Sequence, residues 1–326
     1  MNSPTPLPNA AEVIGVDLGG TKIEAIVLDT QGASLWRERV ATPAGDYGGT
    51  LTAIAQLVRR AETERGLRLA PVGVGTPGSL TRAGLIRNAN STCLNGRALG
   101  RDLECVLGRA VRIANDANCL ALSEAGDGAA AGADVVFAAI LGTGVGGGIV
   151  AHGRLLTGAN GLAGEWGHNP LPWSDAADAP APGCYCGRRG CIESWLSGPG
   201  LARDHARHAA AGASSGNGLD ALQIGERAAL GNAACIATLE RHALRLARAL
   251  AAVINLLDPD VIVLGGGVSN LEHLIDRVTR HWGDWVFNAG AVGAAREPPR
   301  TRLVRSQHGD SSGVRGAAWL WRGTTR

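Results

Sequence analysis

The sequence predicts an α/β protein that is divided into two lobes. Apolar segments of strand length alternate with helical patterns along nearly the whole chain, as they do in α/β folds. The chain has 326 residues, of which 45% are hydrophobic, and is long enough for two domains with a core each. It has 48 glycines, and their clusters fall where predicted strands end. These observations place the functional loops at strand ends.

The first predicted lobe covers 13–132 and follows a lead-in, 1–12, that carries three prolines and is expected to be flexible. Glycine turns join three strands of an antiparallel meander: Val13–Asp17, Ile23–Leu28 and Ser34–Val40. The remaining elements are a helix at Gly49–Arg65, a strand at Val72–Thr76, a helix at Leu99–Leu107, a strand at Val111–Ala114 and a helix at Ala117–Gly128.

The second predicted lobe covers 133–307 and begins with an uninterrupted apolar strand, Val135–Leu141, followed by a hairpin at His152-Gly153. Residues 172–183 are rich in Pro, Ala and Asp and are interpreted as a loop. The later elements are helices at Gly198–His208, Leu219–Leu230 and Ala233–Leu257, a strand at Val261–Leu264, and a last helix at about 308–322 that returns to the first lobe.

Charge and composition exclude several classes of protein. With 31 basic and 29 acidic side chains the net charge is +2, so we expect neither nucleic acid nor an anionic membrane as a partner. Apolar runs fall short of the ~20 residues of a membrane span, and the N-terminus has no export signal. We therefore expect a cytoplasmic protein whose seven cysteines are kept reduced.

Two segments match the pattern G-x-G-x-x-G, at 73–78 and 142–147. A dinucleotide-binding loop needs a helix directly after the last glycine, and neither segment is followed by one. A nicotinamide-dependent dehydrogenase is therefore only a remote alternative.

Three glycine turns at strand ends instead offer bare backbone amides to phosphate oxygens. Each alone is equally consistent with an ordinary tight turn, but together they favour a nucleotide held between the lobes, with Asp17 binding Mg²⁺ or its waters. The candidate residues for ATP and Mg²⁺ are Asp17, Gly19, Gly20, Thr21, Lys22, Gly142, Thr143, Gly144, Gly265 and Gly266.

Lys22 is the chain's single lysine, against thirty arginines. Its retention suggests a slim ammonium near the ATP phosphates, although the side chain could equally extend from its strand to solvent.

Cys184, Cys186 and Cys191 lie within eight residues, with His168 upstream. Three thiolates and one imidazole form the closed shell of a structural Zn²⁺ site. Free thiols or a disulfide remain alternatives, although one intervening residue makes an unstrained Cys184–Cys186 disulfide unfavourable. The other four cysteines are interpreted as small apolar fillers.

Asp116 follows a predicted strand and precedes a helix. A carboxylate there can point into a cleft and accept a proton, but Asp is also a common N-cap residue, and the local pattern favours the cap.

The motifs, taken together, resemble the ROK family of bacterial sugar kinases and repressors. They are DLGGTK (17–22), NDAN (115–118), LGTGVGGG (141–148), EWGH (165–168), CYCGRRGCIE (184–193) and DPDVIVLGGG (258–267). The resemblance implies the two-lobed actin-like ATPase (ribonuclease H-like) fold with a structural zinc loop, and commonly a homodimer. Because only about twelve residues precede the first predicted strand, we do not expect the DNA-binding domain of the family's repressors.

The resemblance also assigns roles to residues. Asp116 matches the general base, and zinc is implied at His168, Cys184, Cys186 and Cys191. The zinc loop is expected to orient the sugar pocket, with His168 donating from its second ring nitrogen to a sugar hydroxyl. Glu165 and Glu193 could alternatively be structural carboxylates held by arginines. The implied sugar-binding residues are Asn90, Asn115, Asp116, Glu165, His168 and Glu193.

Three segments resemble bacterial fructokinases of the manno(fructo)kinase type: RNANSTCLNG (87–96), GEWGHNPLPW (164–173) and HGDSSGVRGAAWLW (308–321). The expected reaction is ATP-dependent conversion of D-fructose to fructose 6-phosphate. The alternatives are an N-acetylglucosamine kinase or glucokinase of the same family and, from another class, a sugar sensor without catalysis. The intact carboxylates and glycine loops argue against the sensor.

Overall fold

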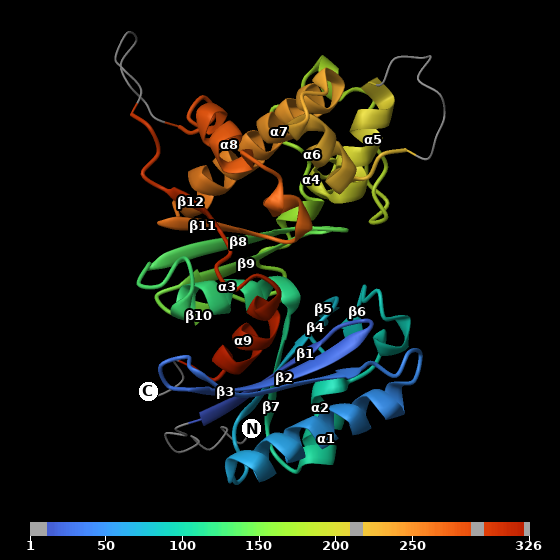
Figure 1. The fold of residues 1–326 in the computed structure, drawn as a ribbon, viewed down its shortest axis with the longest axis vertical. Helices are drawn as coiled ribbons and strands as arrows, with labels where there is room; N and C mark the ends of the chain where they lie inside the picture. Colours follow the sequence, from blue (N-terminus) through green and yellow to red (C-terminus); the bar gives the residue numbers. More distant parts are fainter. Residues whose placement is uncertain (1–11, 209–217, 288–296, 323–326) are drawn as a thin grey trace. The chain divides into compact units, whose positions relative to one another are not determined.

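The computed structural model describes residues 12–208, 218–287 and 297–322 (Figure 1). The chain divides into two compact units: unit 1 comprises 1–132, 148–163 and 306–326, and unit 2 comprises 133–147 and 164–305. The division expected from the sequence differs for 148–163, which it placed in the second lobe. Gly148 packs so closely against α3 (Asp116–Asp127) of unit 1 that a Cβ at this position would collide with the carbonyl oxygen of Ala117. This close contact explains why 148–163 belongs to unit 1. The predicted lead-in lies almost entirely outside the described residues.

Unit 1 contains a five-stranded sheet of order β3-β2-β1-β4-β7. Its first three strands form the predicted antiparallel meander, and β1, β4 and β7 are parallel. The bounds are β1 Glu12–Leu18, β2 Lys22–Asp29, β3 Ser34–Ala41, β4 Val72–Thr76 and β7 Val111–Asn115. A separate small hairpin consists of β5 Ser79–Leu80 and β6 Ile86–Arg87.

Helices cover both faces of this sheet. They are α1 Tyr47–Arg65, α2 Leu99–Leu107, α3 Asp116–Asp127 and α9 Ser312–Trp319, with short 3-10 turns at Thr92–Leu94 and Gly309–Ser311. Ile14 and Val16 pack with α1 in one core, whereas Gly15, between them, faces α9. This alternation is the period of two that β1 requires. A Cβ on Gly15 or Gly73 would collide with carbonyl oxygens of α9, so these glycines permit the close packing of the last helix.

Glu124 of α3 is fully buried and anchors the chain segment that leads into α9. Its carboxylate accepts hydrogen bonds from the amides of Ala129 and Gln307 at 2.9 and 3.0 Å and from the Ser306 hydroxyl at 2.7 Å. Burial alone would raise the pKa of Glu124, but the hydrogen bonds from Ala129, Gln307, Ser306 and His308 hold it below its ordinary value. The ionised form therefore stabilises the fold.

Replacing Glu124 with glutamine is expected to lower the free energy of unfolding by about 2–4 kcal/mol at pH 7, because several buried donors lose a charged acceptor. A lowered folded-state pKa means that this stabilisation is present above the ordinary glutamate range and is lost as the pH falls through the folded pKa. Urea unfolding at pH 7 and at pH 4 tests this. The control is Asp310→Asn, an exposed carboxylate of the same segment. An equal loss at both pH values would contradict the prediction.

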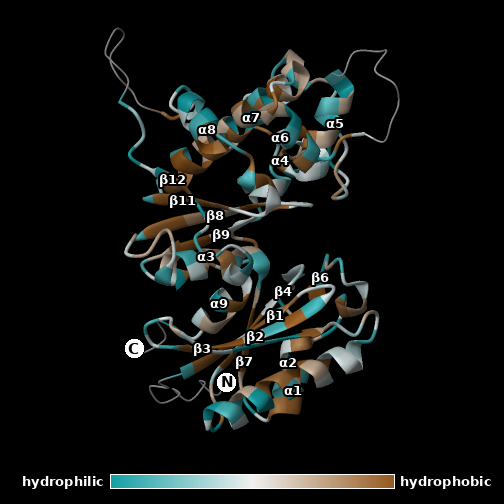
Figure 2. Cartoon of the chain, viewed as in Figure 1, coloured by the Kyte–Doolittle hydropathy of each residue, from teal (hydrophilic) through white to brown (hydrophobic). Residues whose placement is uncertain are grey.

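Unit 2 is built on the second sheet, of order β10-β9-β8-β11-β12, in which β11 is parallel to β8 and β12. Its strands are β8 Val135–Leu141, β9 Val145–Ala151, β10 Arg154–Leu155, β11 Val261–Gly265 and β12 Arg302–Arg305. The division between the units falls within β9, so β10 belongs to unit 1. Strands β8 and β11 are hydrophobic along most of their length (Figure 2), as expected of strands buried on both faces.

The helices of unit 2 surround the long α7. They are α4 Ile192–Leu196, α5 Gly198–His208, α6 Ala221–Ala229, α7 Ala233–Leu257 and α8 Leu274–Trp282, with 3-10 turns at Trp166–His168, Ala176–Asp178 and Gly267–Asn270. The sequence did not predict α4, α8, β12 or the small β5–β6 hairpin. Among the described residues, no helix combines the length and apolar character that a membrane crossing needs.

The segment interpreted as a loop, 172–183, is anchored through one buried acid. Asp178 accepts hydrogen bonds from Arg245 and Arg248 of α7 at 2.8 and 2.7 Å. Burial acts to raise the pKa of Asp178, but the two guanidinium groups hold it below its ordinary value. Arg248 also donates to the carbonyl of Trp173 at 2.6 Å. The segment is thus fixed near its start and at its middle before it reaches the cysteines.

Candidate functional site

Two carboxylates of unit 1 lie near one another at the ends of parallel strands. Asp17 is near the end of β1, and Asp116 is the first residue of α3, directly after β7. The N-cap of α3 is Asn115, whose Oδ1 accepts from the Asn118 amide at 2.8 Å. The cap interpretation of Asp116 is therefore wrong, because its neighbour fills that role. Asp116 Oδ1 accepts from the Ala117 amide at 2.8 Å.

The pKa of Asp17 is raised to about 6. Desolvation is the largest cause, followed by the negative charges of Asp116 and Glu24, while the positive charges of Lys22 and Arg39 act in the opposite direction. Glu24 lies opposite Asp17 in the β1–β2 register. A Cβ on Gly313 of α9 would lie 2.9 Å from Asp17 Oδ2, so α9 closes over the carboxylate. Burial and the charge of Asp116 thus outweigh the nearby positive charges at Asp17, and a bound cation would offset them.

Asp17 is expected to cost stability at neutral pH, since its folded pKa lies above its ordinary value. Replacing it with asparagine should raise the free energy of unfolding at pH 8 by up to about 3 kcal/mol, the equivalent of the shift to about 6. At pH 5 the gain should fall to roughly half, because the unfolded carboxyl is still ionised there and must take up a proton on folding, and it should vanish only below the ordinary value of 3.8. Urea unfolding at both pH values measures it, and a variant that is less stable at pH 8 would contradict the account.

The β1–β2 turn lines a cavity of about 350 Å³ within unit 1. Gly20 and Thr21 form one side of it, and Asn90 forms another. The loop that carries Asn90 is held by Asn95, whose side-chain amide both accepts from the Ala89 amide and donates to its carbonyl at 2.9 and 3.0 Å. The structure therefore places a predicted phosphate turn and a predicted sugar-binding residue on the same cavity.

Gly19 and Lys22 close this turn, since the Gly19 amide donates to the Lys22 carbonyl at 2.9 Å. The Lys22 side chain is half-buried, and its charge lowers the pKa of Asp17. Its proximity to phosphate remains a prediction.

The β8–β9 turn lines a larger cavity, of about 810 Å³, within unit 2. Gly142 and Thr143 lie on one wall, and Gly267 and Val268, which follow β11, lie on another. The turn is fixed by hydrogen bonds from the Gly142 amide to the Gly144 carbonyl at 3.0 Å and from the Gly198 amide to the Gly142 carbonyl at 2.8 Å. Two of the three predicted glycine turns thus border one cavity of nucleoside size.

The glycine turn after β11 lines this cavity with Gly267, whereas the sequence predicted Gly265 and Gly266. Gly265 ends β11, and Gly266 has φ +83° and packs against the backbone of Leu141, so neither lines the cavity. The sequence also missed the walls formed by α5 and α6, because their contribution depends on how the helices pack. These lining residues are Gly198, Pro199, Ala202, Asp220, Ala221, Leu222, Gly225, Glu226 and Ala229.

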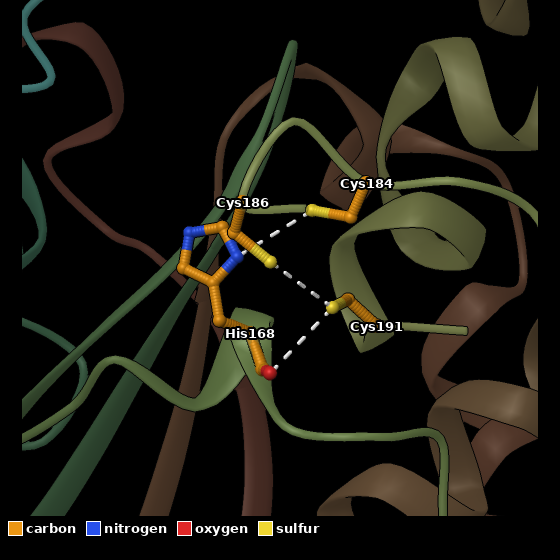
Figure 3. Close-up of side chains that lie close together, drawn as sticks. All are labelled: His168, Cys184, Cys186 and Cys191. Atoms are coloured by element: carbon orange, nitrogen blue, oxygen red, sulfur yellow. Dashed lines mark hydrogen bonds between the residues drawn. The ribbon is translucent and has the colours of Figure 1, made fainter. Parts of the chain in front are cut away.

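The predicted metal cluster is brought together in unit 2 (Figure 3). The candidate ligand atoms of His168, Cys184, Cys186 and Cys191 all lie within 4.8 Å of one another. Cys184 Sγ is 3.6 Å from His168 Nδ1, and Cys186 Sγ is 3.6 Å from Cys191 Sγ. All seven cysteines are free, so no disulfide competes. Of the four cysteines interpreted as fillers, Cys105 is exposed rather than packed.

These atoms fit a zinc ion. Bond lengths of about 2.3 Å to sulfur and 2.0 Å to nitrogen imply edges of roughly 3.5–3.8 Å in a tetrahedron, close to the separations found. The donor set of three thiols and one imidazole is the one that structural zinc prefers. When bound, zinc would hold the hairpin of Cys184 and Cys186 against Cys191 and the 3-10 turn that ends at His168.

The sugar-binding residues predicted in unit 2 surround this cluster. His168 ends a 3-10 turn that Glu165 precedes, and Glu193 lies in α4, two residues after Cys191. Glu193 Oε2 accepts from the Val145 amide at 3.0 Å, and a Cβ on Gly144 would lie 2.7 Å from the same oxygen. Glu193 is thus in part structural, but its partner is backbone rather than arginine. It connects the metal loop to the β8–β9 turn.

The sequence matches the family model described as "ROK family" over residues 13–324. It is 38% identical over 311 residues to an N-acetyl-D-glucosamine kinase of Photobacterium profundum (94% of this chain, 98% of that protein). It is 41% identical over 320 residues to an N-acetyl-D-glucosamine kinase of Erwinia tasmaniensis, with the same coverage.

Among solved structures, a ROK family glucokinase from Streptomyces griseus in complex with glucose and AMPPNP matches with a TM-score of 0.72 at 31% identity, over 95% of this chain and 98% of that one. This likeness supports the two-lobed actin-like fold. The family match covers every motif on which the resemblance rested. The chain belongs to the ROK family.

Proposed function

We propose that this chain is an ATP-dependent sugar kinase whose substrate is N-acetyl-D-glucosamine. The observation that carries the kinase proposal is the pair of carboxylates, Asp17 and Asp116, at the parallel strand ends of unit 1. Family membership and the glucokinase solved with an ATP analogue support it.

The choice of sugar rests on the relatives. Two relatives at 38% and 41% identity are N-acetyl-D-glucosamine kinases, and they favour this sugar over the D-fructose expected from the sequence. The segments that suggested fructose contain residues with structural tasks: Asn95 clamps Ala89, and the Trp166 indole donates to the Gly146 carbonyl at 2.8 Å. Such residues hold the loops in shape, so their presence does not by itself identify the sugar.

In the proposed reaction a sugar hydroxyl attacks the γ-phosphorus of ATP, a new O–P bond forms, and ADP leaves. Asp116 accepts the hydroxyl proton. Mg²⁺, when bound at Asp17 with the phosphates, neutralises charge on the transferred group. Within each unit, a glycine turn offers amides suited to phosphate oxygens, and the 810 Å³ cavity of unit 2 has room for the nucleoside.

An ADP-release assay tests the proposal over N-acetylglucosamine, glucose, mannose, fructose and N-acetylmannosamine. We expect kcat/KM to be at least about tenfold higher for N-acetylglucosamine than for the others, the discrimination that a few pocket contacts provide. A higher value for fructose or glucose would replace the proposed sugar. No turnover with any of them would refute the kinase and favour the sensor.

A further inference from the structure

Tyr185 lies between two of the candidate zinc ligands, in the turn that the Gly187 amide closes by donating to the Cys184 carbonyl at 3.0 Å. Its hydroxyl is 2.9 Å from His168 Nε2, and the two rings meet edge to face with centroids 5.1 Å apart. Neither the family motif nor the reaction proposed above assigns this tyrosine a task.

The two nitrogens of His168 have different partners. Nδ1 faces the cysteine sulfurs, while Nε2 points away from them (Figure 3). An imidazole that offers Nδ1 to a metal as a lone pair carries its hydrogen on Nε2. That N–H is the donor that the sugar hydroxyl is expected to use, and here it is engaged by Tyr185. One N–H cannot serve two hydroxyls at full strength.

The predicted sugar-binding carboxylates belong to the same two loops as this pair. Glu165 precedes the 3-10 turn that ends at His168, and Glu193 lies two residues after Cys191. One Glu193 oxygen, Oε2, accepts from the Val145 amide.

Little else holds the tyrosine in place. The residue is 71% exposed, and among the residues that the structure describes its hydroxyl has His168 as its one hydrogen-bond partner. Rotation of the side chain away from His168 would thus break one hydrogen bond and the edge-to-face ring contact.

On the basis of the proposed function, we infer that the Tyr185 hydroxyl occupies the sugar-hydroxyl position on His168 in the empty site and is displaced when the sugar binds. Tyr185 is then a specificity-determining residue. A sugar whose hydroxyl replaces the lost hydrogen bond binds well, whereas a sugar without a hydroxyl at that point leaves His168 unpaired.

The test compares wild type with Tyr185→Phe, which removes the hydroxyl and keeps the ring. Loss of this one competing hydrogen bond is expected to lower the sugar KM, and the sugar Kd measured by calorimetry without ATP, about two- to tenfold. The kcat, the ATP KM and the zinc content per chain should not change. Tyr47→Phe is the matched control, because it removes the chain's other phenol hydroxyl, which donates to Asp102 in unit 1.

A sugar Kd that is unchanged or higher in Tyr185→Phe would overturn the inference, since the hydroxyl would then be neutral to binding or a direct sugar contact. The two proposals fail differently. If wild type phosphorylates a sugar and the variant does not bind it more tightly, only the inference about Tyr185 fails. If wild type neither binds nor phosphorylates any sugar of the panel, the proposed function fails and the inference falls with it.

Discussion

Replacing Asp116 with asparagine is expected to lower kcat by about 10²–10⁴-fold, the contribution of a well-placed general base. The asparagine Oδ1 can still accept from the Ala117 amide, so α3 should begin as before. Because the variant loses a proton acceptor and retains the glycine turns and Asp17, the affinity for ATP should change little. Steady-state kinetics for sugar phosphorylation, with ATP binding measured by calorimetry, separates these two quantities.

Asp310→Asn is the control for this variant, since it removes an exposed carboxylate of unit 1. Turnover of Asp116→Asn within a few-fold of wild type would remove Asp116 from the role of base. A loss of ATP binding equal to the loss of kcat would instead point to an altered nucleotide site.

Loss of the metal is the second change with a large expected effect. Zinc sites of this kind contribute on the order of 10–16 kcal/mol of apparent binding free energy in small peptides, and that energy is coupled to folding. Cys186→Ala, or chelation, is therefore expected to release the zinc, lower the melting temperature of unit 2 and raise the sugar KM at least about tenfold. Zinc analysis, thermal unfolding and kinetics measure the three effects.

The structure extends this prediction to the nucleotide. Cys191 directly precedes α4, and Glu193 of α4 holds the Val145 amide beside the β8–β9 turn. Disorder of the metal loop should therefore also raise the ATP KM. The control is Cys105→Ala, at an exposed cysteine outside the cluster. A metal-free protein with native sugar affinity would contradict the account.

Most of the fold follows from local patterns. The meander of β1 to β3 and the buried strands β8 and β11 were predicted, because apolar period and glycine turns mark them directly. Helix α8 was missed although Leu274, Val278 and Trp282 repeat at helical spacing. Its N-cap is His273 in the left-handed region without a side-chain cap, so the usual start signal is absent. Strand β12 was missed because it has only four residues, with arginine at both ends, and is too short to show an alternation of apolar and polar residues.

The candidate site divides in the same way. The metal cluster was predicted because its cysteines lie close together in the sequence, at a spacing typical of zinc ligands. Asp178 lies in a Pro- and Ala-rich segment that suggests solvent exposure, and its partners Arg245 and Arg248 are almost seventy residues away. The role proposed for Tyr185 likewise could not be predicted from the sequence, because it depends on the orientation of the His168 ring. Long-range pairing of this kind leaves no local pattern.

The most direct test of the central claim follows the phosphorus by ³¹P NMR. Wild-type protein with Mg²⁺, ATP and N-acetyl-D-glucosamine is expected to produce a sugar-phosphate resonance in step with the loss of the ATP γ-resonance, and Asp116→Asn should slow both equally. Hydrolysis of ATP to inorganic phosphate without a sugar-phosphate resonance, or ATP left intact with this and the other sugars of the panel, would contradict the claim that the chain is a sugar kinase.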